Sequence, residues 1–174
     1  MDSGMHRAGF FPHNFAAAYT ALKQAAKVAE IVKFSHFACA DEPGSGMTEM
    51  QIEAFDLACE GLPGEESLAN SAAILAHPTA RRDWGRAGIA LYGASPFGGT
   101  DERLRPVMRL STAVFGERVL QPHSPIGYGA TFYTSKSTRV GRIACGYADG
   151  YPRRAGTDTP VAIGSHRSRL LGRV

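Results

Sequence analysis

The sequence predicts an α/β domain followed by a mostly antiparallel β domain. Helical and strand-like patterns alternate through about the first 100 residues, which is typical of βαβ units around a parallel sheet. Within residues 95–100 (Ser-Pro-Phe-Gly-Gly-Thr) the helical period stops, and short strand-like runs separated by Gly, Pro and Ser follow. We therefore expect two domains, at residues 1–100 and 101–174.

Length and composition are those of a globular protein with a hydrophobic core. The chain has 174 residues, of which 44% are hydrophobic and 20% charged, and this balance excludes disordered and collagen-like chains. No apolar run reaches the roughly 18 residues of a membrane helix and no signal segment is visible, so we expect neither membrane insertion nor secretion. The net charge of +3 (19 basic minus 16 acidic residues) includes no Lys/Arg run, so no nucleic-acid partner is expected.

The cysteines and histidines form no metal-binding pattern. Cys39, Cys59 and Cys145 share no metal or redox spacing, which is typical of reduced thiols, and we expect a cytoplasmic location. The six histidines are scattered, and none stands at ligand spacing from a cysteine or carboxylate, so no metal site is expected. No GxGxxG motif or P-loop is present.

The first domain alternates helices and strands. The expected elements are a helix over 14–30, a strand over 31–37, a helix opening near 48 and ending near 61, a helical turn over 71–76 and a strand over 89–92. Asn14 is the expected N-cap of the first helix. Thr48 and Gln51 have the spacing of a capping box for the second helix, and Gly61 is a suitable stop for it.

The second domain is expected to contain only strands and turns. The strand-like runs are 107–114, 118–120, 131–134, 139–145 and 161–163. Turns rich in Gly, Pro and Ser separate them, which favours antiparallel pairing.

Candidate site residues follow from the rule that parallel sheets place their chemistry where strands end. His36 lies at such an end, although it could equally be a hydrogen-bonded core histidine. Ser71 could be a helix N-cap or part of a phosphate site at a helix N-terminus. Arg86 could serve a site or be a surface residue in an Arg-rich loop with Arg81 and Arg82.

Two tyrosines between glycines and one early arginine complete the candidates. Tyr128 stands in the segment GYGAT and Tyr147 in GYADGYP. Neighbouring glycines leave room for backbone approach to a reachable hydroxyl, which suits proton transfer. The alternative for both is a turn whose tyrosine packs on the β domain. Arg7 is a further candidate in the N-terminal loop.

Six ordered segments together resemble a known enzyme family. They are DSGMHRAGF (2–10), SHFACAD (35–41), SLANSAA (67–73), RAGIALYG (86–93), GYGAT (127–131) and GYADGYPR (146–153). Taken in this order they resemble alanine racemase, the pyridoxal 5′-phosphate (PLP) enzyme that interconverts L- and D-alanine. The resemblance runs through essentially the whole chain. It implies a partial (β/α)₈ TIM-type barrel in residues 1–100 and the first part of the family's C-terminal β domain in 101–174.

The resemblance implies a cofactor role for several residues. Arg7 would reach the phenolic oxygen of PLP and the substrate carboxylate. Arg86 would face the pyridine nitrogen and, because a guanidinium stays protonated, would leave that nitrogen unprotonated. Ser71 and the backbone amides of Gly88 and Ile89 would hold the phosphate.

It also implies the residues that act on the substrate. Tyr128 would be the base on one face of the α-carbon, contributed to the active site of a partner subunit in a homodimer. His36 would connect Arg86 to the tyrosine base through hydrogen bonds. Tyr147 would line the substrate entrance.

Racemisation needs a second base on the opposite face, which in the family is the lysine that carries PLP. None of the four lysines, Lys23, Lys27, Lys33 and Lys136, matches that lysine, and we expect all four to face solvent. A (β/α)₈ barrel alone takes about 250 residues.

We therefore expect the central portion of an alanine racemase, lacking both ends and inactive by itself. The alternatives are an inert remnant, a half that needs a complementary fragment, and a racemase for serine or another small amino acid.

Overall fold

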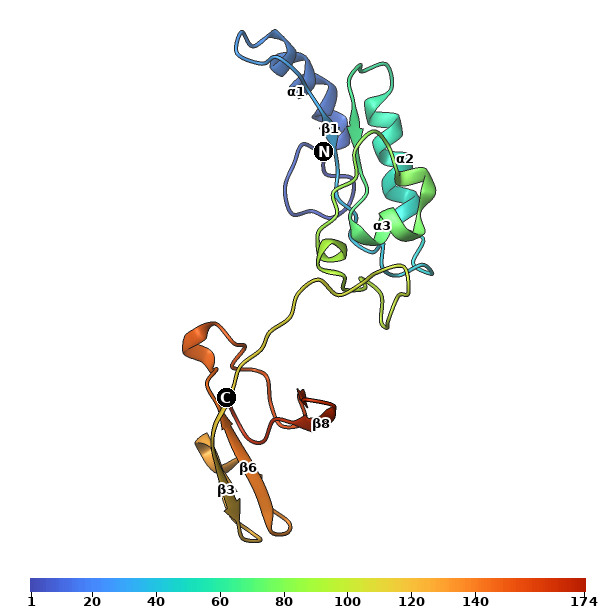
Figure 1. The fold of residues 1–174 in the computed structure, drawn as a ribbon. Coiled ribbons are helices and arrows are strands. Elements are labelled where there is room, and N and C mark those ends of the chain that lie inside the picture. The colour runs from blue at the N-terminus through green and yellow to red at the C-terminus, as the bar shows by residue number, and fades with distance from the viewer. The chain divides into compact units, whose positions relative to one another are not determined.

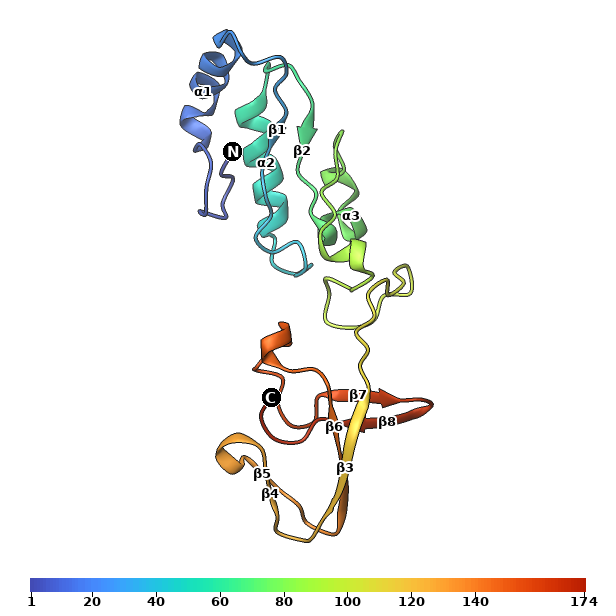
Figure 2. The same ribbon diagram turned by 60° about the vertical axis from the view of Figure 1, so that its left-hand side comes forward.

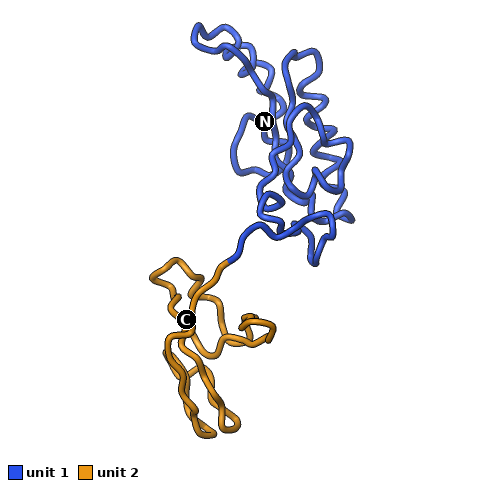
Figure 3. The backbone as a smooth tube through the Cα atoms, viewed as in Figure 1, with its two compact units in different colours: residues 1–109 blue, residues 110–174 orange.

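A short parallel pair of strands forms the centre of the first of two units. The computed structural model describes residues 1–174 and divides into Met1–Arg109 and Leu110–Val174 (Figure 3). In the first unit β1 (Lys33–Phe34) pairs in parallel with β2 (Glu66–Ser67). The chain at 84–86 then follows β2, because Trp84 N–H donates to Glu66 O at 3.1 Å and Arg86 N–H donates to Ala69 O at 2.8 Å. Adjacent parallel segments are the arrangement that the alternating pattern predicts.

The two faces of β1 differ, as the twofold side-chain alternation of a strand requires. Lys33, Ser35 and Phe37 are buried, whereas Phe34 is exposed. Buried residues of α2 and α3 join Phe37 in one apolar cluster with Phe55. The sheet therefore has one face that carries the core and another that carries Phe34.

Three α-helices belong to this unit (Figures 1 and 2). They are α1 (Pro12–Gln24), α2 (Met47–Cys59) and α3 (Ser71–Ala76), with 3₁₀ helices η1 (Pro78–Ala80) and η2 (Ile89–Tyr92) after them. None of the helices has the length and apolar composition of a membrane span.

Two helix starts differ from the prediction. Pro12 rather than Asn14 opens α1, with Phe11 as the N-cap, because proline fits the first helical position, where no N–H partner is needed. Gly46 caps α2 in a left-handed conformation (φ +67°). The expected capping box of Thr48 and Gln51 is wrong, since both residues lie within α2, after the N-cap, and both side chains are buried in the protein.

The end of α2 is confirmed, and one predicted strand is wrong. Gly61 takes φ +71° directly after α2, and Leu62 N–H donates to Cys59 O at 3.0 Å, which is the expected glycine stop. Residues 89–92 form η2 instead of a strand, since Leu91 N–H donates back to Gly88 O at 3.0 Å. The extended chain in this region lies earlier, at 84–86.

The second unit contains three antiparallel strand pairs, as the pattern predicts. They are β3 (Val114–Leu120) with β6 (Thr138–Ile143), β4 (Pro125–Ile126) with β5 (Phe132–Tyr133), and β7 (Pro160–Ile163) with β8 (His166–Arg169). Two 3₁₀ helices accompany them, η3 (Tyr128–Ala130) and η4 (Tyr147–Asp149).

Some strand limits in this unit differ from the prediction. Residues 107–113 form no strand despite their apolar pattern, because no neighbouring strand pairs with them. The strands β4 and β8 were not predicted. The strand β4 has only two residues, the first of them a proline, and β8 consists of the polar residues His-Arg-Ser-Arg. Neither sequence therefore shows the apolar and polar alternation that marks a strand.

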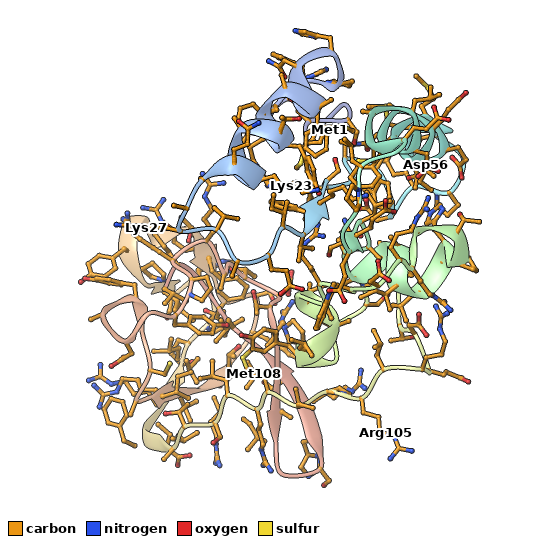
Figure 4. All side chains as sticks on the ribbon, turned by 90° about the horizontal axis from the view of Figure 1, so that it is seen from above. Met1, Lys23, Lys27, Asp56, Arg105 and Met108 are labelled. Atoms are coloured by element: carbon orange, nitrogen blue, oxygen red, sulfur yellow. The ribbon has the colours of Figure 1, made fainter.

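Lys33 contradicts the expectation that every lysine faces solvent. Its side chain is 3% exposed, and its Nζ donates to Leu62 O at 2.6 Å and to Glu66 Oε1 at 3.0 Å. Arg82 Nη1 lies 3.5 Å from the second oxygen of Glu66. The other lysines, Lys23 and Lys27 (Figure 4) and Lys136, are exposed. Lys33 is buried because it stands directly opposite Glu66 on the core-facing side of the strand pair.

Replacing Lys33 by methionine tests this buried ion pair. Lys33→Met keeps an unbranched apolar stem but leaves Glu66 without its nearest cation. Removing one partner of a buried pair is strongly destabilising, and Arg82 compensates in part, so we expect a loss of about 2–3 kcal/mol in the free energy of unfolding, measured by urea denaturation. Lys23→Met, at an exposed position of α1, should change it by less than about 0.5 kcal/mol. Equal effects of the two substitutions would contradict the role of the pair.

Candidate functional site

The candidate residues of the first unit gather where the parallel segments end. His36 follows β1, Ser71 begins the helix after β2, and Arg86 closes the third extended segment. Carboxyl ends of neighbouring parallel strands meet at one edge of a sheet. The structure therefore brings together residues that are distant in the sequence, as the strand-end rule predicts.

Arg86 connects the ends of β1 and β2. Its Nη1 donates to Ser67 O at 2.8 Å and to Ser67 Oγ at 2.6 Å, while its Nη2 donates to Ser35 O at 2.6 Å. The guanidinium also lies 5.2 Å from the ring centre of Phe34, a cation–π contact. Burial lowers the pKa of Arg86, but a guanidinium remains charged in proteins. The interpretation of Arg86 as a surface residue is therefore wrong.

The neighbours of His36 favour one tautomer of its neutral imidazole. Arg86 Nη2 lies 3.3 Å from His36 Nδ1, and a guanidinium can only donate, so Nδ1 must accept. The pKa of His36 is lowered from 6.5 by burial first, and then by the charges of Arg86 and Arg7. A neutral imidazole that accepts at Nδ1 carries its proton on Nε2. His36 therefore offers an N–H donor at Nε2.

Arg7 stands in a loop that is closed around Asp2. The buried Asp2 accepts hydrogen bonds at Oδ1 from Gly4 N–H (3.1 Å) and His6 N–H (3.0 Å). Its backbone N–H donates to Phe10 O at 2.8 Å. The hydrogen bond from the His6 backbone is the main cause that lowers the pKa of Asp2. The Arg7 side chain is exposed, and its charge reaches His36, so Arg7, His36 and Arg86 form one positively charged region.

Asn70, and not Ser71, caps α3. Asn70 Oδ1 accepts from Ala73 N–H at 3.0 Å, which satisfies one of the helix's free donors. Ser71 is buried, and its Oγ accepts from Gly88 N–H at 2.9 Å and from Ala90 N–H at 3.2 Å. The Ser71 hydroxyl donates no hydrogen bond within the chain. This arrangement leaves the Ser71 hydroxyl proton without an acceptor, whereas the amides of Gly88 and Ala90 are occupied by the Ser71 oxygen.

The two candidate tyrosines lie in the second unit. Tyr128 is 67% exposed in η3 and Tyr147 is 55% exposed in η4, so both hydroxyls are accessible. Of the four lysines, Lys33 is held by Leu62 O and Glu66, and the other three are exposed. No group of three or more His, Cys, Asp or Glu side chains is arranged to hold a metal ion.

Sequence reasoning missed four residues that support the site. Ser35 and Ser67 hold Arg86, Asn70 caps α3, and Gln51 binds the backbone of His36. Asn70 had a usable signal, because asparagine directly before a helical turn is a preferred N-cap. The other three depend on contacts between distant segments, for which a single sequence carries no signal.

Parallel backbone segments with helices between them, with His36 and Arg86 at the segment ends, define an α/β protein, joined here to an antiparallel β unit. Comparison with protein families agrees. Residues 1–96 match the family model described as alanine racemase, N-terminal domain, and residues 107–174 match alanine racemase, C-terminal domain. The chain belongs to the alanine racemase family.

Individual relatives support this assignment. The alanine racemase of Neisseria meningitidis serogroup C is 77% identical over 174 residues, and that of Aromatoleum aromaticum is 51% identical over 174 residues. The crystal structure of the biosynthetic alanine racemase from Pseudomonas aeruginosa is similar over 100% of this chain, with a TM-score of 0.91 and 44% identity. The chain covers 49% of each of these three proteins. It therefore spans about half the length of the relatives it matches.

The lowered pKa of His36 predicts how stability depends on pH. As the pH falls below 6.5, the unfolded chain binds a proton at residue 36 before the folded chain does. His36 therefore reduces stability progressively from that pH down to its lowered folded-state pKa, below which the penalty is complete. Replacing His36 by glutamine should flatten the loss of stability between about pH 7.5 and about pH 5, measured by urea denaturation.

A histidine elsewhere in the same unit provides the control. His13 is exposed on α1, and His13→Gln should retain the pH dependence of the unsubstituted chain. If both substitutions flatten it equally, the environment of His36 is not the cause.

Proposed function

We propose that the chain supplies the central part of a PLP-dependent alanine racemase. The first unit would be the latter part of its (β/α)₈ barrel, and the second unit the first part of its β domain. The parallel segments with helices between them support the first assignment, and the antiparallel pairs support the second. Solved structures named alanine racemase cover the whole chain at 44% and 31% identity.

The observation that carries the proposal is the pair of polar clusters around Ser71 and Arg86. The Ser71 hydroxyl has a free proton to donate, and the amides of Gly88 and Ala90 converge on its oxygen. Gly88 has no side chain to cover this place, and the Ile89 amide lies between the two. The Ser71 hydroxyl and the Ile89 amide donate no hydrogen bond within the chain. They would hold the phosphate of PLP, and the Gly88 amide would join them by turning from Ser71 Oγ to a phosphate oxygen.

Arg86 and Arg7 would act on the ring and on the substrate. Arg86 is anchored by three oxygen acceptors, and a guanidinium does not lose its proton in proteins. It would therefore donate a hydrogen bond to the ring nitrogen without protonating it. Arg7, exposed at the tip of the Asp2 loop, would bind the phenolic oxygen of PLP and the substrate carboxylate. When bound, PLP supplies an electron-withdrawing ring that acidifies the α-proton of the amino acid.

Proton transfer would use one tyrosine and one lysine. Tyr128 would remove or return the α-proton on one face, at the active site of a second subunit of a homodimer. In return, His36 would support the phenolate of the partner subunit's Tyr128 through the Nε2 proton. Tyr147 would line the substrate entrance. The lysine base and covalent attachment point would lie in a part of the full-length protein that this chain does not cover, because none of Lys23, Lys27, Lys33 and Lys136 matches the family's lysine and Lys33 is engaged by Glu66. We also propose that the enzyme works in the cytoplasm.

Phosphate recognition by Ser71 can be measured on the chain as it is. We expect PLP to bind non-covalently and Ser71→Ala to weaken binding by about tenfold, as the loss of one hydrogen bond to a charged group predicts. Titration of PLP followed by its absorbance gives the dissociation constants. Ser137→Ala, at an exposed position between β5 and β6, is the matched control and should leave the affinity unchanged. Identical affinities for all three proteins would contradict the phosphate site.

A second measurement addresses the missing lysine. With PLP and L-alanine present, we expect the chain to form no D-alanine, as measured by chiral chromatography, and borohydride reduction to leave no PLP on any lysine. A stable lysine adduct together with D-alanine formation would show that one of the four lysines acts as the second base.

A further inference from the structure

Gln51 is a fully buried side chain that the sequence pattern assigned to a helix cap. It lies on α2 and is 0% exposed. Its Oε1 accepts from Ala38 N–H at 2.9 Å, and its Nε2 donates to His36 O at 2.9 Å and to Ser3 Oγ at 3.0 Å. A buried carboxamide is destabilising unless its polar atoms find partners. Here both atoms have them, and the partners come from two segments far apart in the sequence.

Each partner segment of Gln51 carries a charged or titratable group of the site. In the segment that follows β1, the acceptor is the backbone carbonyl of His36 itself. The other acceptor is Ser3, which lies inside the loop that Asp2 closes and that presents Arg7. Ser3 Oγ also lies 2.6 Å from Ser35 Oγ, and the carbonyl of Ser35 accepts from Arg86. One side chain of α2 therefore bonds directly to the backbone of His36 and to the loop that presents Arg7, and through Ser3 it is connected to Ser35, which holds Arg86.

Helix packing alone does not require a carboxamide at this position. Thr48, one turn earlier on α2, is 2% exposed, and its Oγ1 makes no hydrogen bond. The helix therefore tolerates a buried side chain that contributes only packing at this depth. The geometry of Gln51 differs because every bond it makes is directed at a segment that bears a site residue.

We propose that Gln51 is a positioning residue: its carboxamide fixes the backbone of His36 and the loop that carries Arg7 against one helix and so holds the two side chains at their working separation. This deepens the proposed function, because it concerns the same site. The groups that face His36 are the guanidinium groups of Arg86 and Arg7. When the anchor is removed, the loop and the histidine are free to move apart. The imidazole then loses part of its burial, which is the main cause of its lowered pKa, and part of its positively charged surroundings.

The experiment measures the titration of His36 in the full 174-residue chain by NMR of the imidazole signals, without PLP. Gln51→Met keeps an unbranched side chain of similar length and removes all three hydrogen bonds. We expect the pKa of His36 to move upward, toward its ordinary value of 6.5. We also expect the Ala38 amide to exchange with solvent roughly tenfold faster, because its acceptor is gone.

Two further variants make the result decisive. Thr48→Val removes a buried hydroxyl that has no partner from the same helix, and the pKa of His36 should stay as in the unsubstituted chain. Ser3→Ala removes only the bond to the Arg7 loop and is the substitute if Gln51→Met does not fold; it should move the pKa upward by less. An unchanged pKa in folded Gln51→Met or Ser3→Ala, or an equal change in Thr48→Val, overturns the proposal. Because PLP is not needed, a failure to bind PLP would bear on the proposed function alone.

Discussion

The guanidinium of Arg86 is the interaction on which the site depends. It donates to the carbonyls of Ser35 and Ser67, which lie at the ends of two different strands, and it also approaches His36 Nδ1. One permanently charged, planar group thereby satisfies backbone acceptors that the short strands leave open and determines which nitrogen of His36 carries a proton. The two roles of Arg86 are coupled, because its Nη2 both holds the carbonyl of Ser35 and lies next to His36 Nδ1.

In the same unit, Asn70 and Gln51 provide hydrogen bonds that the backbone and a neighbouring loop require. Asn70 satisfies the end of α3, which leaves the Ser71 hydroxyl free to donate. Gln51 bonds to Ser3 in the N-terminal loop and to the backbone of His36 after β1. In both cases one side chain meets a hydrogen-bonding requirement of the backbone or of a neighbouring loop.

Patterns of local origin were predictable from the sequence. The end of α2 at Gly61 and the turns rich in Gly, Pro and Ser between the strands of the second unit depend on residues close in the chain. Contacts between distant segments were not. The spacing of Gln51 from Thr48 fits a capping box, and nothing in the sequence indicates that Gln51 is buried and bonds to three distant groups. The apolar run 89–92 is too short to distinguish a strand from a 3₁₀ helix. The strand-end rule grouped His36, Ser71 and Arg86, yet their hydrogen bonds depend on serines that no local pattern marks.

The buried pair of Lys33 and Glu66 has a consequence for the opposite face of the sheet. Each of the two strands has only two residues, so few ladder hydrogen bonds oppose sliding of one strand along the other. A slip by one position would exchange the faces of Lys33 and Phe34, separating the ammonium from its carboxylate and removing the ring on which Arg86 lies. The ion pair therefore fixes the register of β1 and β2. A buried charge on one face of the strand pair in this way determines which side chains lie on the opposite face.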